Sequence, residues 1–241
     1  MISILPLAGL PEIEAGDDLA ALIAGAAVLE DGDVVVVAHK VVSKAEGRAV
    51  RLDEVDPSER ARELAGPDRD PRELEVVLRE TVRVVRQRGP LVIGETRHGF
   101  VCASAGVDHS NAPAAGTLVL LPLDPDASAR RIRDALETRT GRLVAVVVAD
   151  SFGRPFRHGT TDVAIGVAGL SPLVDLRGTL DRGGRPLRST QIAVADEIAS
   201  AADLARGKAD GVPVVVVRGL ALAGDGSARE LVMEPERDLF R

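Results

Sequence analysis

Three short apolar runs constrain the fold of this chain more than any other feature. Residues Val34–Ala38, Leu143–Ala149 and Val212–Arg218 are built mainly from valine, alanine and leucine. Runs of this length and β-branched content are typical of strands that are buried on both faces of a sheet. Between these runs, apolar residues recur at helical spacing, so strands are predicted to alternate with helices in a mixed α and β fold.

The other expected elements follow from the same patterns. Further strands are predicted at Ile2–Leu7 and Thr117–Leu123. The charged stretch Pro57–Asp70 predicts an exposed connection, and the charged end Ala228–Arg241 predicts no regular element. With 241 residues, the chain fits one large domain or two small ones. The predicted helices are Asp17–Val28, Asp70–Arg86, Ala127–Thr138 and Gln191–Arg206.

Composition excludes several classes of protein. The net charge of −7 argues against a nucleic-acid-binding surface, and four phenylalanines without Tyr or Trp argue against stacking on single strands. No apolar run approaches the roughly 20 residues that span a bilayer, and the N-terminus does not resemble a signal peptide. The single cysteine, Cys102, is expected to be a small buried residue in a protein of the reducing cytoplasm.

The first candidate site follows the run Val34–Ala38. No glycine-rich nucleotide motif is present, but His39, Lys40 and Lys44 come directly after this predicted strand. Ligand crevices commonly lie where parallel strands end, and lysine is a compact donor to phosphate. Because the chain has only three lysines, two of them four residues apart indicate phosphate binding; the alternative is a solvated loop.

Two further polar segments favour a hard cation and an anionic ligand. Asp108 and His109 are candidate ligands of a divalent cation, and Asp beside Ser or Asn favours hard ions such as Mg²⁺ or Mn²⁺. The alternative is an Asx-turn loop, in which Asp108 and Asn111 bind backbone N–H groups. Asp150 and Ser151 follow the run Leu143–Ala149 and again offer a carboxylate and a hydroxyl. Their neighbours Arg154, Arg157 and His158, together with Arg97, suit an anionic substrate. By contrast, the predicted helix carboxylates are expected to be solvated: Asp196, Glu197 and Asp203.

Five blocks of the chain resemble the coenzyme F420-0:L-glutamate ligase family. The resemblance runs in order from about residue 3 to residue 220 and includes the segments GLPEI, HKVVSKAEGR, ETRHGFVCASAGVDHSN, ADSFGRPFRHGTTDVAIG and STQIAVADEIASAADLARGKADGVPVVVVRG. It implies an α+β fold with mixed sheets, flanking helices and two intertwined subdomains. It also implies a ligase domain over residues 1–220 and a C-terminal extension over 221–241, which would link to a nitroreductase-like domain in some relatives.

The activity implied by the resemblance is GTP-dependent addition of L-glutamate to the lactyl carboxylate of coenzyme F420-0, followed by γ-linked additions. A divalent metal (Mg²⁺ or Mn²⁺), a monovalent cation (K⁺) and a homodimer are implied as well. The metal ligands carried over from the family are Asp108, Asp150 and Ser151. The nucleotide contacts carried over are Leu10, Pro11, Glu12, Ile13, His39, Lys40, Lys44, Asn111, Arg206, Gly207 and Lys208. At position 208 the resemblance leads us to expect a metal-ligating amide, which the protonated Lys208 cannot replace.

The chemistry of such a ligase agrees with these residue types. A carboxylate becomes a good electrophile once the γ-phosphoryl group of GTP converts it to an acyl phosphate, and no side chain need act as a nucleophile. Arg97, Arg154, Arg157 and His158 are assigned to the acidic acceptor on charge alone. Two other classes remain open: a metal-dependent phosphohydrolase or phosphotransferase, and a non-catalytic module that binds a deazaflavin.

Overall fold

The main body of the protein is a five-stranded mixed sheet with helices on both faces. The computed structural model describes every residue except 68, 208, 209, 240 and 241. The strand order is β1-β12-β2-β8-β9, in which β2 and β8 pair in parallel and all other neighbours are antiparallel. These strands span Ser3–Leu7, Val214–Arg218, Val34–Ala38, Ala145–Gly153 and Thr160–Ala168 respectively.

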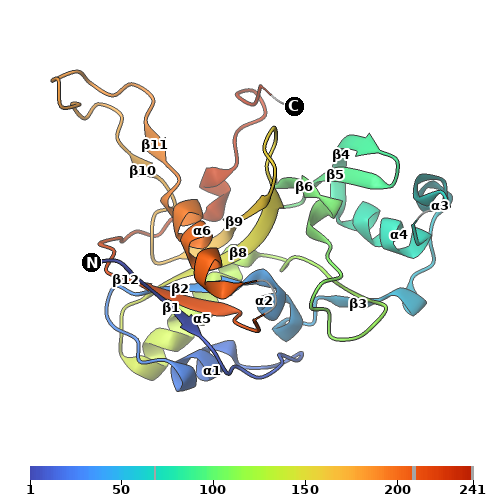
Figure 1. Ribbon diagram of the computed structural model, residues 1–241, viewed down its shortest axis with the longest axis horizontal. Helices are drawn as coiled ribbons and strands as arrows, with labels where there is room; N and C mark the ends of the chain where they lie inside the picture. Colours follow the sequence, from blue (N-terminus) through green and yellow to red (C-terminus); the bar gives the residue numbers. More distant parts are fainter. Residues whose placement is uncertain (68, 208–209, 240–241) are drawn as a thin grey trace.

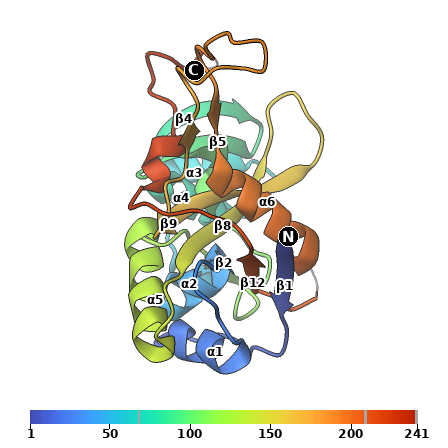
Figure 2. The same cartoon turned by 90° about the vertical axis from the view of Figure 1, so that its left-hand side faces the viewer.

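The valine runs fill both sides of this sheet, as the sequence predicts. Alternate residues such as Val35 and Val37 pack with α1 and α5, whereas Val34 and Val36 pack against alanines of α6. Figures 1 and 2 accordingly show α6 on one face and the α1–α5 pair on the other. The helices span Leu19–Ala26 (α1), His39–Ala45 (α2), Pro125–Thr140 (α5) and Val194–Arg206 (α6).

A smaller lobe between β2 and β8 has its own hydrophobic cluster, which includes Leu74, Val77, Val92 and Leu118. Figure 1 shows its helices and its β4–β5 hairpin to one side of the main sheet. The elements are β3 (Ala49–Arg51), α3 (Glu59–Ala65), α4 (Pro71–Glu80), β4 (Thr81–Arg88), β5 (Leu91–Thr96), β6 (Val101–Ala103) and β7 (Thr117–Val119).

Two predictions fail in this lobe. The stretch Pro57–Asp70 is not merely a connection, because it contains helix α3. Ser58 caps this helix, and its Ala61 and Ala65 are buried. The helix predicted over Asp70–Arg86 ends at Glu80, and the following residues form β4 instead. Threonine and valines dominate the start of β4 and favour an extended backbone, and β5 supplies the pairing partner.

Strand β8 is longer than its apolar run. It continues through Gly153 and forms a hairpin with β9, so Asp150 and Ser151 belong to a strand and not to the polar loop that we predict. A second hairpin, β10 (Val174–Asp175) with β11 (Gln191–Ile192), projects away from the body in Figure 1. The C-terminal segment contains a short 3₁₀ helix over Ala228–Leu231, against the prediction of no element there.

The fold class is therefore α+β, in agreement with the sequence. The intertwined subdomains and the boundary at residue 220 stay predictions. Cys102 is buried as expected, and burial raises the pKa of its thiol to about 12. None of the helices in the described ranges combines the length and the apolar character that a membrane span requires.

Candidate ligand-binding site

The main candidate site is a pocket of about 280 Å³ at the ends of the parallel strands β2 and β8. Ala38 and Ala149 are paired at these ends, so the residues that follow them come together at one edge of the sheet. Every described residue of the predicted nucleotide and metal sets lines this pocket; Lys208 lies outside the described residues. The lining is Leu10–Ile13, Ala38–Val41, Lys44, Asp108, Asn111, Ala149–Ser151, Asp203, Arg206, Gly207 and Gly211–Pro213.

The two lysines reach the pocket from helix α2, which excludes the solvated-loop alternative for this segment. Lys40 and Lys44 are one helical turn apart, and the Lys44 side chain is almost fully buried. Lys44 pairs with the exposed carboxylate of Glu12, and Lys40 with Asp108 at 2.6 Å between Nζ and Oδ2. Both cations therefore lie at the pocket wall, each held by one carboxylate.

Asp108 forms the Asx-turn that the sequence leaves open, and it also lines the pocket. Its Oδ1 accepts a hydrogen bond from the Ser110 backbone N–H at 2.8 Å, which is the Asx-turn. Its Oδ2 accepts from the Ser110 hydroxyl and pairs with Lys40. Burial alone would raise the pKa of Asp108, but the Lys40 ammonium and the Ser110 donors outweigh it and lower the pKa to about 2. A carboxylate thus faces the pocket at neutral pH.

His39 and Asp150 follow the paired strand ends and lie side by side. The His39 ring is buried, and its Nε2 lies 3.1 Å from Oδ1 of Asp150 without the alignment of a hydrogen bond. Its Nδ1 is 3.5 Å from the Ser43 hydroxyl. The carboxylate of Asp150 also accepts the Ser151 backbone N–H at 2.7 Å. Both residues line the pocket where the two strands end.

The third wall comes from Ser151, on β8, and Arg206, the last residue of α6. Both bind the carboxylate of Asp162, which is wholly buried on β9. Ser151 Oγ donates to Oδ1 at 2.5 Å, and Arg206 Nη1 donates to Oδ2 at 2.6 Å. Within the described part of the chain, the buried Nε and Nη2 atoms of Arg206 have no hydrogen-bond partner.

The oxygen donors of this pocket fit a hard divalent cation whose remaining coordination positions are filled by a bound ligand and water. Asp108, Asp150 and Ser151 all offer oxygen atoms to the pocket. Among the described residues, no three His, Cys, Asp or Glu side chains lie close enough to hold a metal ion unaided. Mg²⁺ ordinarily takes one or two carboxylates and completes its shell with waters and phosphate oxygens, so this set suits it.

The four residues assigned to an acidic substrate on charge alone do not line the pocket. Arg154, Arg157 and His158 lie in the exposed turn between β8 and β9, where Arg154 Nη2 donates to the His158 carbonyl at 2.8 Å. Arg97 follows β5 and lies 3.5 Å from Glu80. The structure therefore does not bring this group together with the predicted nucleotide and metal residues.

Two acidic residues near the pocket escape the sequence-based reasoning. Asp203 is expected to be solvated, yet it lines the pocket from α6. Asp162 is not among the predicted site residues, although it binds two pocket residues. Asp196 is likewise not solvated: it is half-buried and accepts the Ala164 backbone N–H at 2.9 Å. The sequence gives one indication that Asp196 is buried: it lies in helical phase with Ala199 and Asp203, on the side of α6 that faces the sheet.

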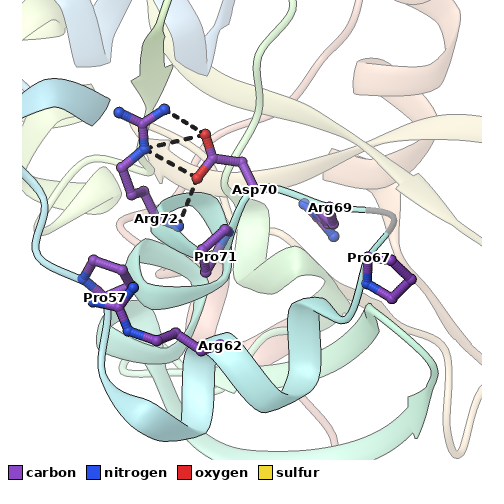
Figure 3. Close-up of a pocket in the computed structure, with 7 residues that line it drawn as sticks. All are labelled: Pro57, Arg62, Pro67, Arg69, Asp70, Pro71 and Arg72. Atoms are coloured by element: carbon purple, nitrogen blue, oxygen red, sulfur yellow. Dashed lines mark hydrogen bonds and ion pairs between the residues drawn. The ribbon is translucent and has the colours of Figure 1, made fainter.

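A wider hollow of about 590 Å³ lies on the smaller lobe and does not make a comparable site (Figure 3). Its arginines are already paired: Arg72 with Asp70 at 2.6 Å, Arg69 with Glu73, and Arg62 with Asp56. Its other lining residues are prolines, and it is open to solvent. Volume therefore does not show which hollow is the binding site. The charged groups that converge on the pocket at the sheet edge favour that pocket.

Comparison with known proteins points in one direction. The profile of the F420-0:gamma-glutamyl ligase family matches residues 9–219. A coenzyme F420:L-glutamate ligase of Methanothermobacter thermautotrophicus is 46% identical over 250 residues, covering 100% of this chain and 99% of the relative. Proteins of the same name from Methanopyrus kandleri and Archaeoglobus fulgidus are 48% and 45% identical, covering 95% and 100% of this chain and 94% and 96% of their own lengths.

Proposed function

Because this chain belongs to the F420-0:gamma-glutamyl ligase family, we propose that it uses GTP to join L-glutamate to coenzyme F420-0. The observation that carries the proposal is the single pocket that collects Lys40, Lys44, Asp108, Asp150 and Ser151 from separate segments of the chain. Cationic and acidic groups side by side suit a nucleotide phosphate chain that arrives with a divalent cation. γ-Linked additions of further glutamates would use the same site.

The lysines are assigned to the phosphates of GTP. Lys40 and Lys44 lie one turn apart on α2, and their ammonium groups can donate to adjacent phosphate oxygens. Each lysine also has a carboxylate partner, Asp108 or Glu12, so each is already held at the pocket wall. This pre-organisation lowers the cost of ordering a long side chain when the nucleotide binds.

Asp108, Asp150 and Ser151 would hold Mg²⁺ or Mn²⁺. When bound, the cation would neutralise charge on the phosphates during phosphoryl transfer. The His39 ring beside Asp150 limits the directions in which this carboxylate can turn. The exposed arginines Arg154 and Arg157 lie in the turn that follows β8, the strand that carries Asp150 and Ser151, and we assign them to the acidic acceptor.

The reaction then needs two displacements. A carboxylate oxygen of F420-0 attacks the γ-phosphorus of GTP, and the bond between this phosphorus and the β,γ-bridging oxygen breaks. GDP is released, and the carboxylate has become an acyl phosphate. The glutamate amine attacks the acyl carbon, an amide bond forms, phosphate departs, and the amine proton passes to solvent. The protein contributes positioning and charge, because the described residues of the pocket include no activated nucleophile and the Cys102 thiol is buried with a raised pKa.

Mass spectrometry tests this proposal directly. The purified protein is incubated with F420-0, GTP, glutamate and either Mn²⁺ or Mg²⁺. We expect product masses that rise by glutamate units, with one GDP and one phosphate released for each amide bond. Phosphate release without a mass increase would support the phosphohydrolase or phosphotransferase instead, and binding of F420-0 without turnover would support the deazaflavin-binding module.

We also propose that the ligase is a homodimer and that its activity requires a monovalent cation, K⁺, as the family resemblance implies. Sedimentation at several protein concentrations tests the first statement. Replacement of K⁺ by Na⁺ in the assay tests the second, with activity expected to fall.

A further inference from the structure

Asp162 is a buried carboxylate that the proposed function does not use. It lies on β9 directly opposite Ser151 of β8, so the two side chains share one face of the antiparallel pair. Its side chain has no exposed surface, and its two oxygens are divided between Ser151 and Arg206. Both partners line the pocket, whereas Asp162 itself does not. One carboxylate therefore links two pocket residues that come from different elements.

The bond to Asp162 decides what the Ser151 hydroxyl offers to the pocket. A hydroxyl has one proton to donate and two lone pairs that accept. Asp162 Oδ1 takes that proton at 2.5 Å. Toward any other group the Ser151 oxygen then acts as an acceptor, which is the role that a ligand of a cation must have.

The same carboxylate fixes the guanidinium of Arg206. Nη1 donates to Asp162 Oδ2 at 2.6 Å, and the Arg206 side chain is buried at the end of α6. The Nε and Nη2 atoms are also buried and find no acceptor among the described residues. Buried donors without partners are costly, so an arrangement of this kind is typical of a group that receives an anionic ligand.

We propose that Asp162 is a positioning residue, which turns Ser151 into a cation acceptor and holds Arg206 ready for an anionic oxygen of the ligand. This inference rests on the proposed function, because it assigns the cation and the anion to the nucleotide complex. It differs from a purely structural role, in which Asp162 only balances the buried charge of Arg206 and fastens α6 to β9.

A double-mutant cycle separates the two roles. Asp162→Asn keeps the shape of the side chain but replaces one acceptor oxygen with an N–H donor, so either Ser151 or Arg206 loses its acceptor. The cycle combines this change with Ser151→Ala. Asp196→Ala serves as the control, because Asp196 is a second carboxylate that joins α6 to β9 but lies outside the pocket.

Two binding measurements and a melting curve are made on each protein. Electron paramagnetic resonance gives the Mn²⁺ affinity in the presence of the GTP analogue guanosine 5′-(β,γ-imido)triphosphate, and calorimetry gives the affinity for the analogue. We expect Asp162→Asn to weaken Mn²⁺ binding by about ten- to a hundred-fold, the usual effect of losing a partner behind a metal ligand. In the Ser151→Ala background the same change should cost no further Mn²⁺ affinity.

Each outcome bears on the inference. Analogue binding should also weaken in Asp162→Asn, while Asp196→Ala should melt earlier and bind both ligands normally. Equal losses of Mn²⁺ affinity in both backgrounds, or a loss that Asp196→Ala reproduces, would leave only the structural role and overturn the inference. Wild-type protein that binds the Mn²⁺–analogue complex but makes no amide would refute the proposed function alone. Wild-type protein that binds no Mn²⁺ with the analogue would refute both.

Discussion

The ammonium of Lys40 lies 2.6 Å from the carboxylate of Asp108, so a predicted phosphate donor and a predicted cation ligand are joined directly. This pairing sets up an exchange of partners. A nucleotide phosphate would take Lys40, and the accompanying divalent cation would take Asp108. Binding would then replace one ion pair with two, so both groups would be paired before and after it.

The first prediction concerns the two lysines. Lys40→Ala and Lys44→Ala should each weaken GTP binding by roughly ten- to a hundred-fold, because each loses a charge-assisted contact of about 1.5–3 kcal/mol. Glutamate affinity should change much less. Calorimetry with each ligand measures both effects, and Arg131→Ala provides a control that removes one exposed positive charge away from the pocket. Unchanged GTP affinity in both lysine variants would exclude the phosphate assignment.

The second prediction concerns Asp150. Asp150→Asn should fold like the wild type, because strand β8 keeps its pairing and the amide keeps the shape of the side chain. Its Mn²⁺ affinity should fall by about ten-fold or more, and ligation should be lost. Asp134→Asn on the exposed side of α5 is the matched control. If Asp150→Asn turned over at the wild-type rate in saturating Mn²⁺, Asp150 would not be a metal ligand.

The third prediction concerns the hairpin arginines. Arg154→Ala and Arg157→Ala should bind GTP almost normally and lose affinity or rate for F420-0. In a purely structural role they would tie the loop to a neighbouring carboxylate such as Asp162 or Asp175, but these carboxylates are bound by Arg206 and Arg177. Separate titrations of the two ligands, with melting curves, measure the effect. Equal losses for GTP and F420-0 together with earlier melting would indicate a structural role.

The fourth prediction concerns pH and the half-buried Asp196. Burial raises the pKa of this carboxyl, and the hydrogen bond from Ala164 only partly opposes the shift. A carboxyl whose pKa is higher in the folded state favours folding at low pH, and that contribution is lost as the pH rises through the folded pKa. Asp196→Asn carries no charge, so its free energy of unfolding should exceed that of the wild type near pH 7.

Urea unfolding across the range from about pH 4 to pH 7 measures this difference. The advantage of Asp196→Asn should shrink as the pH falls and the wild-type carboxyl is protonated. Glu197→Gln, an exposed neighbour on the same helix, is the control and should show no such trend. A constant difference between Asp196→Asn and the wild type at all pH values would contradict the prediction.

The parts of the fold that follow from sequence are those with a strong local signal. The valine runs place β2, β8 and β12 because few other structures suit them. Helix α3 escapes detection because its buried positions, Ala61 and Ala65, are small and stand among charged residues. The end of α4 is missed because tertiary pairing with β5 decides where the helix gives way to strand.

The pocket shows the same division. Polar residues directly after a predicted buried strand, such as His39 and Asp150, can be recognised because parallel strands end at one edge. The partnership of Asp162 with Arg206 has no local signal, since the two residues are 44 positions apart and meet only after α6 packs on β9. Asp203 looks like any other helix carboxylate until that packing is known.

The parallel pairing of β2 with β8 also governs when the pocket can exist. The whole smaller lobe lies between these strands in the chain, and Arg206 follows later still. A growing polypeptide therefore cannot assemble the site stepwise: its first half ends before Asp150 has been made. Closing so long a loop is slow relative to forming local structure. A nucleotide that binds this pocket would therefore stabilise the finished molecule and would not act as a template for the early steps of folding.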